Sequence, residues 1–408
     1  MPESQTMTAK RRSKRIFTQL AWTLSALLMS MTTANADGAT LQLSLGTRDI
    51  LHNRQVTGTN GKALMRGSYT QSFGKVDLGI SLAAEDAAQT FNADGSYVNL
   101  NFGGWVLGAG TVDRHWSYSP HTSLILSANA RPMRSAYLKK TTNASTSPLL
   151  SWAGPWGGEF FVGQTSGGPG SGGLNFMGAR LELEPVAGLK AEFIQTAQFT
   201  GGIASLGTAL AGNTNEGAGA EINKMAGFGL SYSLNSNRVY LQAIGEDEAG
   251  GLPSCWMHLI GLERKMDAAS IPTTLNIEVV DTRIDRTTNG YCGPNTAYNN
   301  GTHPYTNDGS VMGASIDSEG KSIQLSVGHN FGVYDFEWGI GQYTVNDKSS
   351  PSHRLASRRE EGRIYHMGLA RQIGSLKLSG TMSYQGLDLD KAGISSGLAL
   401  NMTAERRF

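Results

Sequence analysis

The sequence predicts an all-β protein, a transmembrane antiparallel up-and-down β-barrel of about 18 strands with short periplasmic turns and long outer loops. Three observations lead to this prediction. Segments that alternate apolar and polar residues recur along most of the chain, and their connections alternate short and long in step. No segment after the N-terminus approaches the roughly 20 apolar residues of a spanning helix. A chain that crosses lipid on strands must close into a barrel, because lipid offers no hydrogen bonds to a sheet edge.

The N-terminal residues have the pattern of a secretory signal peptide. Five basic residues between Lys10 and Arg15 precede an apolar run from Ile16 to Met31, and Ala34-Asn35-Ala36 fits a cleavage site. A retained membrane anchor is the weaker alternative, since polar residues interrupt the short apolar run. We therefore expect a signal peptide at 1–36 and an outer-membrane β-barrel at 37–408.

The composition supports export to a membrane. The chain has 52 glycines in 408 residues and a charged fraction of 16%, against about 7% glycine and about 25% charged residues in ordinary domains. Cleavage would remove five of the 34 basic residues and one of the 33 acidic residues, leaving 29 and 32. This balance gives no indication of a nucleic-acid partner.

The alternation predicts 18 strands. They are expected at 41–45, 62–73, 75–85, 97–102, 105–112, 149–153, 156–164, 175–184, 189–198, 224–234, 238–246, 255–264, 273–282, 321–331, 333–343, 362–371, 375–386 and 397–408. The last is the clearest, because Leu398, Leu400 and Met402 alternate with Ala399 and Asn401. It ends on Phe408, as bacterial outer-membrane barrels usually do.

The connections set the expected orientation. Short turns are predicted at 73–75, 103–104, 154–155, 185–188, 235–237, 265–272, 332 and 373–374. Long links are predicted at 48–61, 86–96, 113–133, 165–174, 199–223, 247–254, 283–320, 344–361 and 387–396. We expect the short turns to face the periplasm and the long links the cell exterior. A soluble β-sandwich would not alternate so regularly.

The two cysteines are predicted to form a disulfide. Cys255 lies at the outer end of a predicted strand, and Cys292 lies in the loop that follows the next strand. Both therefore lie on one side of the membrane, in an oxidising compartment. The alternative is a pair of buried free thiols.

Several longer motifs resemble a known family. They are Thr111-Val112-Asp113-Arg114-His115-Trp116, the stretch from Leu124 to Pro132, Leu149 to Trp156, Thr196-Ala197-Gln198, Ile244 to Ser254, Tyr298-Asn299-Asn300 and Gly313 to Asp317. Together they are similar to the Wzi-type capsule-assembly outer-membrane proteins of Gram-negative bacteria. The resemblance covers the chain from about Tyr97 to the C-terminus.

The resemblance implies an 18-stranded outer-membrane barrel that acts as a lectin and attaches secreted capsular polysaccharide to the cell surface. Two features depart from the family. Its members carry a helical bundle before the barrel, at the periplasmic mouth, whereas here a strand pattern begins at Thr40. The family's second aromatic residue after Asp113-Arg114 is replaced by His115. The sequence leaves open whether the lumen is plugged.

Three stretches supply candidate polysaccharide ligands. Sugar polymers are held by aromatic faces and by side chains that make paired hydrogen bonds. The first stretch offers Asp113, Arg114, Trp116, Asn129 and Arg131. An equally credible alternative is that Asp113 and Arg114 pair with each other and fold the loop into the barrel mouth.

The other two stretches are acidic. Glu246, Asp247 and Glu248 are predicted to contact basic sugars or a hard cation such as calcium, although such carboxylates are more often matched by lumen arginines or solvated. Glu278, Asp281 and Tyr298 complete the candidates.

The remaining function classes have less support. Paired carboxylates also occur in glycosidases, but no other feature favours catalysis, so the protein is predicted not to be an enzyme and to need no cofactor or metal. A porin-like channel for small solutes or oligosaccharides is the main alternative. The expected partners are a capsular or extracellular polysaccharide and outer-membrane lipids, bound by a monomer.

Overall fold

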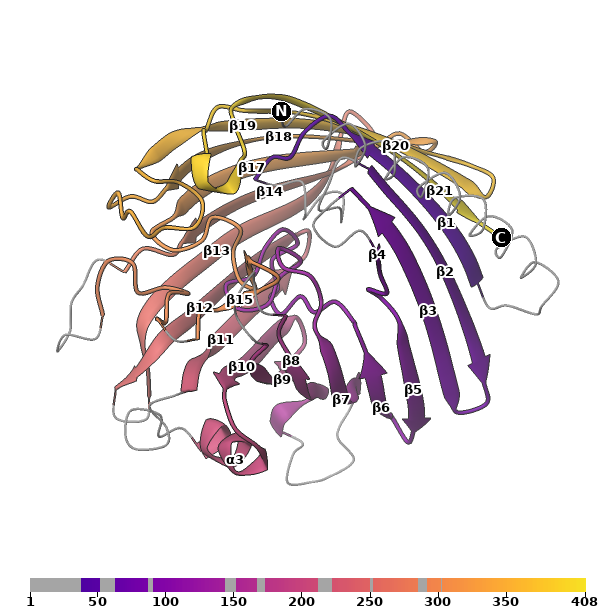
Figure 1. Ribbon diagram of the computed structural model, residues 1–408. Coiled ribbons are helices and arrows are strands. Elements are labelled where there is room, and N and C mark those ends of the chain that lie inside the picture. The colour runs from indigo at the N-terminus through magenta and orange to yellow at the C-terminus, as the bar shows by residue number, and fades with distance from the viewer. Residues whose placement is uncertain are drawn as a thin grey trace, which may run out of the picture.

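The computed structural model describes residues 38–51, 63–86, 91–143, 152–166, 173–211, 222–249, 252–284, 292–301 and 303–408. The predicted signal peptide at 1–36 lies outside these residues. The described chain forms a ring of strands (Figure 1).

The first half of the ring contains β1 (Gly38–Gly46), β2 (Ala63–Phe73), β3 (Val76–Glu85), β4 (Phe91–Asn92), β5 (Tyr97–Phe102), β6 (Trp105–Gly110), β7 (Arg134–Asn143), β8 (Trp156–Gln164), β9 (Asn175–Val186), β10 (Leu189–Phe199) and β11 (Ile222–Leu234). The second half contains β12 (Asn237–Ala249), β13 (Leu252–Ala268), β14 (Ile271–Asp281), β17 (Lys321–Asn330), β18 (Tyr334–Val345), β19 (Glu360–Ile373), β20 (Leu376–Gln385) and β21 (Gly397–Arg407). The loops also contain α3 (Ile203–Ala211), a 3-10 turn at Asp390–Ala392, and a small hairpin of β15 (Thr306–Asn307) and β16 (Ser310–Val311).

The sheet closes on itself. Each strand pairs antiparallel with its neighbours along the chain, and β1 pairs with both β2 and β21. β4 and β5 both pair with β3 and occupy one strand position, while β15 and β16 form a separate sheet. The predicted closed barrel of 18 strands is therefore confirmed. Closure satisfies the backbone hydrogen bonds that lipid could not.

Side chains alternate across the wall as the sequence predicts. In β21, Leu398, Leu400 and Met402 are exposed on the outside, whereas Ala399 and Asn401 are buried against the lumen. The two ends of the barrel differ in their connections. We call the end that carries turns such as 74–75 and 103–104 the short-turn end, and the opposite one the long-loop end. β1 begins and β21 ends at the short-turn end.

Three predicted boundaries are wrong. The sixth strand position is β7 at Arg134–Asn143 and not 149–153. Part of the segment 149–153 lies outside the described residues, and Trp152 and Ala153 belong to no strand. The sequence pattern of β7 is not recognisable as alternating, because the adjacent residues Lys139 and Lys140 are both charged although one faces the lumen and the other faces outward. β12 and β13 extend through most of the predicted link 247–254. The turn predicted at 265–272 shrinks to Ala269-Ser270, both with positive φ, as a two-residue hairpin requires.

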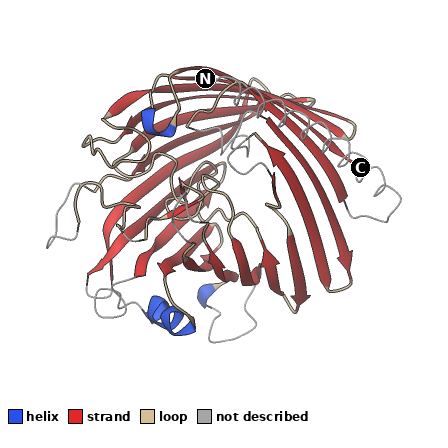
Figure 2. Ribbon diagram, viewed as in Figure 1, coloured by secondary structure: helices blue, strands red, loops and turns tan. Residues whose placement is uncertain are grey.

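Helix α3 lies outside the ring of strands (Figure 2). Its residue Ala209 packs with Met177 and Ala197 on the outward face of β9 and β10. Within the described residues, no helix is long and apolar enough to cross a membrane.

Candidate functional site

The loop between β6 and β7, residues 111–133, folds into the barrel (Figure 1). We call it the plug loop. Its segment Leu124–Leu126 is buried, and the Leu124 N–H donates to Gln242 of β12 at 2.8 Å. At its tip, the Ser119 hydroxyl donates to Glu278 of β14. The plug loop therefore crosses the lumen and is bound to the far wall.

A second inward loop covers the plug loop from the long-loop end. We call residues 282–320 the cover loop; residues 285–291 and 302 of it lie outside the described part. The Tyr298 hydroxyl donates to the Leu124 carbonyl at 2.8 Å, and the Tyr298 ring stacks on Tyr305 with centroids 6.0 Å apart. Both rings are fully buried. Tyr298, a predicted sugar contact, thus stabilises the packing between the two loops.

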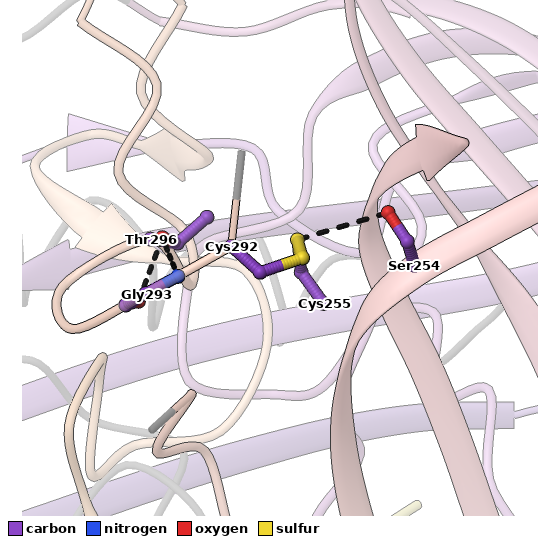
Figure 3. Close-up of a disulfide and its surroundings, with 5 residues drawn as sticks. All are labelled: Ser254, Cys255, Cys292, Gly293 and Thr296. Carbon is purple, nitrogen blue, oxygen red and sulfur yellow. Dashed lines mark hydrogen bonds between the residues drawn. A yellow bond between two sulfur atoms is a disulfide. The ribbon is translucent and has the colours of Figure 1, made fainter. Parts of the chain in front are cut away.

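The predicted disulfide between Cys255 and Cys292 is present, with Cα atoms 5.2 Å apart (Figure 3). Cys255 has φ 54°, and the pairing of β12 and β13 is interrupted between Cys255 and Glu246 without a change of register. The Thr296 hydroxyl donates to the Gly293 carbonyl at 2.7 Å and so folds the chain next to Cys292 (Figure 3). The bond ties the cover loop to the barrel wall.

Arg114 and Trp116 lie beneath the surface. Arg114 Nε donates to Glu159 of β8 at 2.6 Å, and its guanidinium lies 3.8 Å from the ring centroid of Phe161. The Trp116 ring packs on Phe161 at 5.5 Å and is only 2% exposed. The partner of Arg114 is therefore Glu159 and not Asp113. Both side chains hold the plug loop in place, and Trp116 presents no face to a ligand in this conformation.

Arg131 joins the plug loop to its surroundings. Its Nη2 lies 2.7 Å from Asp94, and the carboxylates of Glu85 and Asp308 lie 4.0 and 3.9 Å from the guanidinium. The side chain is 6% exposed. Arg131, Glu85, Asp94 and Asp113 line a cavity of about 310 Å³ between the plug loop and β2–β3. We call it the inner cavity. Asp113 and Arg131, two of the predicted sugar contacts, therefore line one cavity.

Asn129 lies on the other side of the same loop tip, facing the long-loop end. Its Nδ2 donates to the Val311 carbonyl at 2.8 Å. It lines a second cavity of about 310 Å³, which we call the outer cavity. The other polar side chains of the outer cavity are Asp49, Ser310, Ser315, Asp317, Arg354 and Lys391. Five separate loops contribute to it, so the fold converges on this point.

The predicted acidic candidates are separated. Glu246 is buried and accepts the Tyr298 N–H at 3.0 Å. Asp247 and Glu248 continue β12, paired with Ser254 and Pro253; their side chains lie outside the described part, so their role stays a prediction. No group of three or more metal-ligating side chains occurs among the described residues.

Glu278 and Asp281 also differ in their surroundings. Glu278 is fully buried in the lumen, where it accepts the Tyr240 hydroxyl at 2.9 Å. Asp281 accepts both Nε and Nη2 of Arg283, at 2.9 and 2.7 Å, and is half-buried at the rim. Glu278 therefore anchors the plug loop, and Asp281 remains within reach of a surface ligand.

The sequence analysis missed Asp317, Arg354 and Lys391. Arg354 Nε donates to Asp317 at 2.8 Å, which joins the loop after β18 to the cover loop. One signal was available, because Asp317 ends the family-like segment Gly313 to Asp317. Lys391 had none, since it lies in a short polar loop that carries no recognisable motif.

His353 locks the loop after β18, residues 346–359, to the cover loop. The ring is 2% exposed. Its Nδ1 accepts the N–H groups of Leu355 and Ala356 at 3.1 and 3.4 Å, so Nε2 carries the proton and donates to the Ser318 carbonyl at 2.9 Å. Burial lowers the pKa of His353. The nearby Asp317 carboxylate raises this pKa, and the charges of Arg354 and Lys391 lower it further.

We expect this loop to open in acid. The folded pKa of His353 lies below its ordinary value of about 6.5, so the open loop binds the proton more readily. Stability of the closed loop is therefore full above about pH 6.5 and falls as pH drops below it. Hydrogen exchange in residues 346–359 should be faster at about pH 5 than at about pH 7.5 after intrinsic correction. In His353→Asn, the amide oxygen accepts the same N–H groups without titrating, and this pH dependence should vanish. Equal wild-type protection at both pH values would contradict the mechanism.

Comparison with known proteins agrees with the observed fold. The family model described as capsule assembly protein Wzi matches residues 11–369. A Klebsiella pneumoniae protein, described as an uncharacterized 55.8 kDa protein in the cps region, is 28% identical over 207 residues. These residues are 48% of this chain and 41% of that protein, so the match spans less than half of the relative.

Solved structures show the same architecture. The chain is similar to Wzi of Escherichia coli, described as an outer membrane protein involved in group 1 capsule assembly and a carbohydrate-binding β-barrel. The TM-score is 0.79 at 20% identity, over 94% of this chain and 87% of that one. The Pseudomonas aeruginosa barrel OccK5 (OpdH) gives a TM-score of 0.51 at 9% identity, over 91% and 97%. The chain therefore belongs to the Wzi family of capsule-assembly proteins and is an outer-membrane β-barrel.

Proposed function

We propose that this barrel holds a secreted capsular or extracellular polysaccharide at the cell surface, as a monomeric lectin without catalytic activity. One observation carries the proposal. Five loops at the long-loop end build the outer cavity from amide, hydroxyl, carboxylate, guanidinium and ammonium groups. These groups suit the hydroxyls and charges of a sugar polymer.

The filled lumen favours binding over transport. The plug loop crosses the barrel at Gln242 and Glu278, and the cover loop packs on it through Tyr298. A porin-like channel needs a continuous water-filled path. The family-like motifs that supply Arg114, Trp116 and Glu246 build this filling, and Asn129 and Asp317 face the outer cavity.

Weak contacts at one barrel are sufficient for such a role. A polymer that engages one site presents its next repeats at high effective concentration to neighbouring barrels, so avidity exceeds single-site affinity. The buried Trp116 and Tyr298 offer no stacking face, which leaves hydrogen bonds and charge as the main contacts of the outer cavity.

The test uses a capsule-forming strain that lacks this protein, complemented with variants. Wild type should restore cell-bound polymer. Lys391→Glu reverses an exposed charge on the outer cavity, so polymer should move into the medium while total polymer stays constant. Lys348→Glu is the matched control, because Lys348 is exposed on a neighbouring loop and pairs with Asp347 at 3.9 Å.

Two outcomes would reject the proposal. A strain without the protein that keeps all its polymer attached excludes the attachment role. Unchanged polymer together with altered uptake of small solutes would favour the channel instead.

A further inference from the structure

The lipid-facing wall carries a groove of about 760 Å³, lined by residues from β6 to β13. At one level of the wall the strand register aligns Phe160, Ala179, Gln195, Ala226 and Trp256. The two outer members are large and aromatic, and the two alanines between them are small. This order leaves a depression with an apolar floor between two aromatic ridges.

Helix α3 closes the groove toward the long-loop end. Gln195 Nε2 donates to the Ala209 carbonyl of α3 at 2.9 Å, which satisfies a polar side chain that otherwise faces lipid. Directly beyond Gln195, Met177 and Ala197 are fully buried under the helix. The groove therefore has an upper boundary, and α3 is part of it.

Two indoles and a cation bound the groove toward the short-turn end. The rings of Trp105 and Trp156 meet edge to face with centroids 6.4 Å apart. Lys140 Nζ lies 4.0 Å from the Trp156 ring centroid and donates to the Trp156 carbonyl and to Asn143, at 2.9 and 2.6 Å. Trp residues of this kind mark the headgroup level of a membrane. The lower boundary is therefore an interface with a fixed positive charge.

We propose that this groove is a phospholipid site. One acyl chain lies on Ala179 and Ala226, and the phosphate lies near Lys140, in the leaflet that surrounds the short-turn end. The four residue steps from Trp156 to Phe160 span about 14 Å of strand. Strands of such barrels are tilted by about 35–45°, so this length covers about 10–11 Å of depth. That depth lies within one leaflet of a hydrocarbon core of about 30 Å.

The chemistry of the boundaries selects this occupant. The groove lies at hydrocarbon depth, where a polysaccharide cannot enter. Its cation is at the short-turn end, so the headgroup must be there, and the chain must run toward α3. The site is independent of the proposed sugar attachment, since it rests on the outward face of the barrel alone.

The test is native mass spectrometry of protein purified from outer membranes in mild detergent. Wild type should retain one phospholipid. Ala179→Leu and Ala226→Leu fill the floor with extra methylenes, so the bound fraction should fall by about fivefold or more. Ala404→Leu is the matched control. Ala404 lies on β21, in another part of the wall, and it faces outward because it alternates with lumen-facing residues. Heat-modifiable electrophoretic mobility confirms that every variant folds.

The variant Lys140→Gln distinguishes the contribution of the lipid headgroup to binding from that of the acyl chain. It should reduce retention of anionic phospholipid more than that of the zwitterionic species, because it removes only charge. Wild type without a lipid, alanine variants that retain as much as Ala404→Leu, a mass of lipid A, or a dimer in place of a lipid adduct would each overturn the proposal.

Discussion

Arg131→Met should turn the filled barrel into a conducting one. Arg131 is the cation among Glu85, Asp94 and Asp308, and it joins the barrel wall to both inward loops. Removing one partner of a buried ion pair costs about 3–5 kcal/mol, because the remaining charges stay buried without compensation. Here Asp94 and Asp308 would lose the cation between them, and Glu85 would keep only Arg66 at 3.8 Å, so the three carboxylates would repel each other. We expect this repulsion to part the plug loop from β3 and to admit ions.

Planar-bilayer recordings measure this effect. Wild type should show few or no openings, and Arg131→Met should show frequent steps of clearly larger conductance. Arg66→Met is the control, since Arg66 lines the same cavity but is more exposed and lies 3.8 Å from Glu85 alone. It should conduct like wild type. Closed recordings from Arg131→Met would show that Arg131 does not hold the plug loop, and would return it to the candidates for direct sugar contact.

The sequence predicted the barrel because lipid imposes simple rules. Every wall residue faces either lipid or lumen, so alternation such as Leu398, Ala399, Leu400 identifies a strand without tertiary information. The rule failed at β7, where Lys140 faces out at the short-turn rim and is stabilised by the Trp156 ring. A lysine near the membrane surface can extend its charge into the headgroup region. Alternation of hydrophobicity does not indicate how deep a residue lies in the membrane.

The candidate site was harder to predict, because inward loops obey no such period. Trp116, Glu278 and Tyr298 were chosen as residue types that bind sugars. In the structure each of them has a structural role instead: it either forms a hydrogen bond with a buried polar group or fills the core. Glu278 accepts from the plug loop, and Tyr298 donates to it. Sequence alone could not decide between the two roles, since burial depends on where a loop of more than 20 residues folds back.

Asn129 and Lys391 show that the sequence also does not predict which distant residues share a cavity. They are 262 positions apart in sequence. They line one cavity because the barrel closes between β21 and β1 and because the plug loop folds inward. Closure brings the last loop beside the first. The sequence predicts that the barrel closes, but it does not indicate that Asn129 and Lys391 lie close together.

Replacing both cysteines by serine should release the cover loop. The disulfide between Cys255 and Cys292 closes 37 residues of chain, for which the loop-entropy relation gives about 4 kcal/mol. Local opening of the cover loop should become more favourable by that amount, so its amides should exchange about a thousandfold faster. Useful reporters are the N–H of Tyr298, bonded to Glu246, and the N–H of Met312, bonded to the Tyr305 carbonyl.

Strands β17 and β18 serve as the internal control. β14 separates them from β13, which carries Cys255, so their ladder from Lys321 to Asn330 should keep its protection. The same variant links structure to function. The cover loop contributes Ser310, Ser315 and Asp317 to the outer cavity, so its release should scatter these groups and weaken polymer retention in the complemented strain. Retention that survives a thousandfold loss of protection would mean that the polymer binds elsewhere on the long-loop end, with Asp281 and the end of β12 as the next candidates. Unchanged exchange would show that packing around Tyr298 holds the loop without the disulfide.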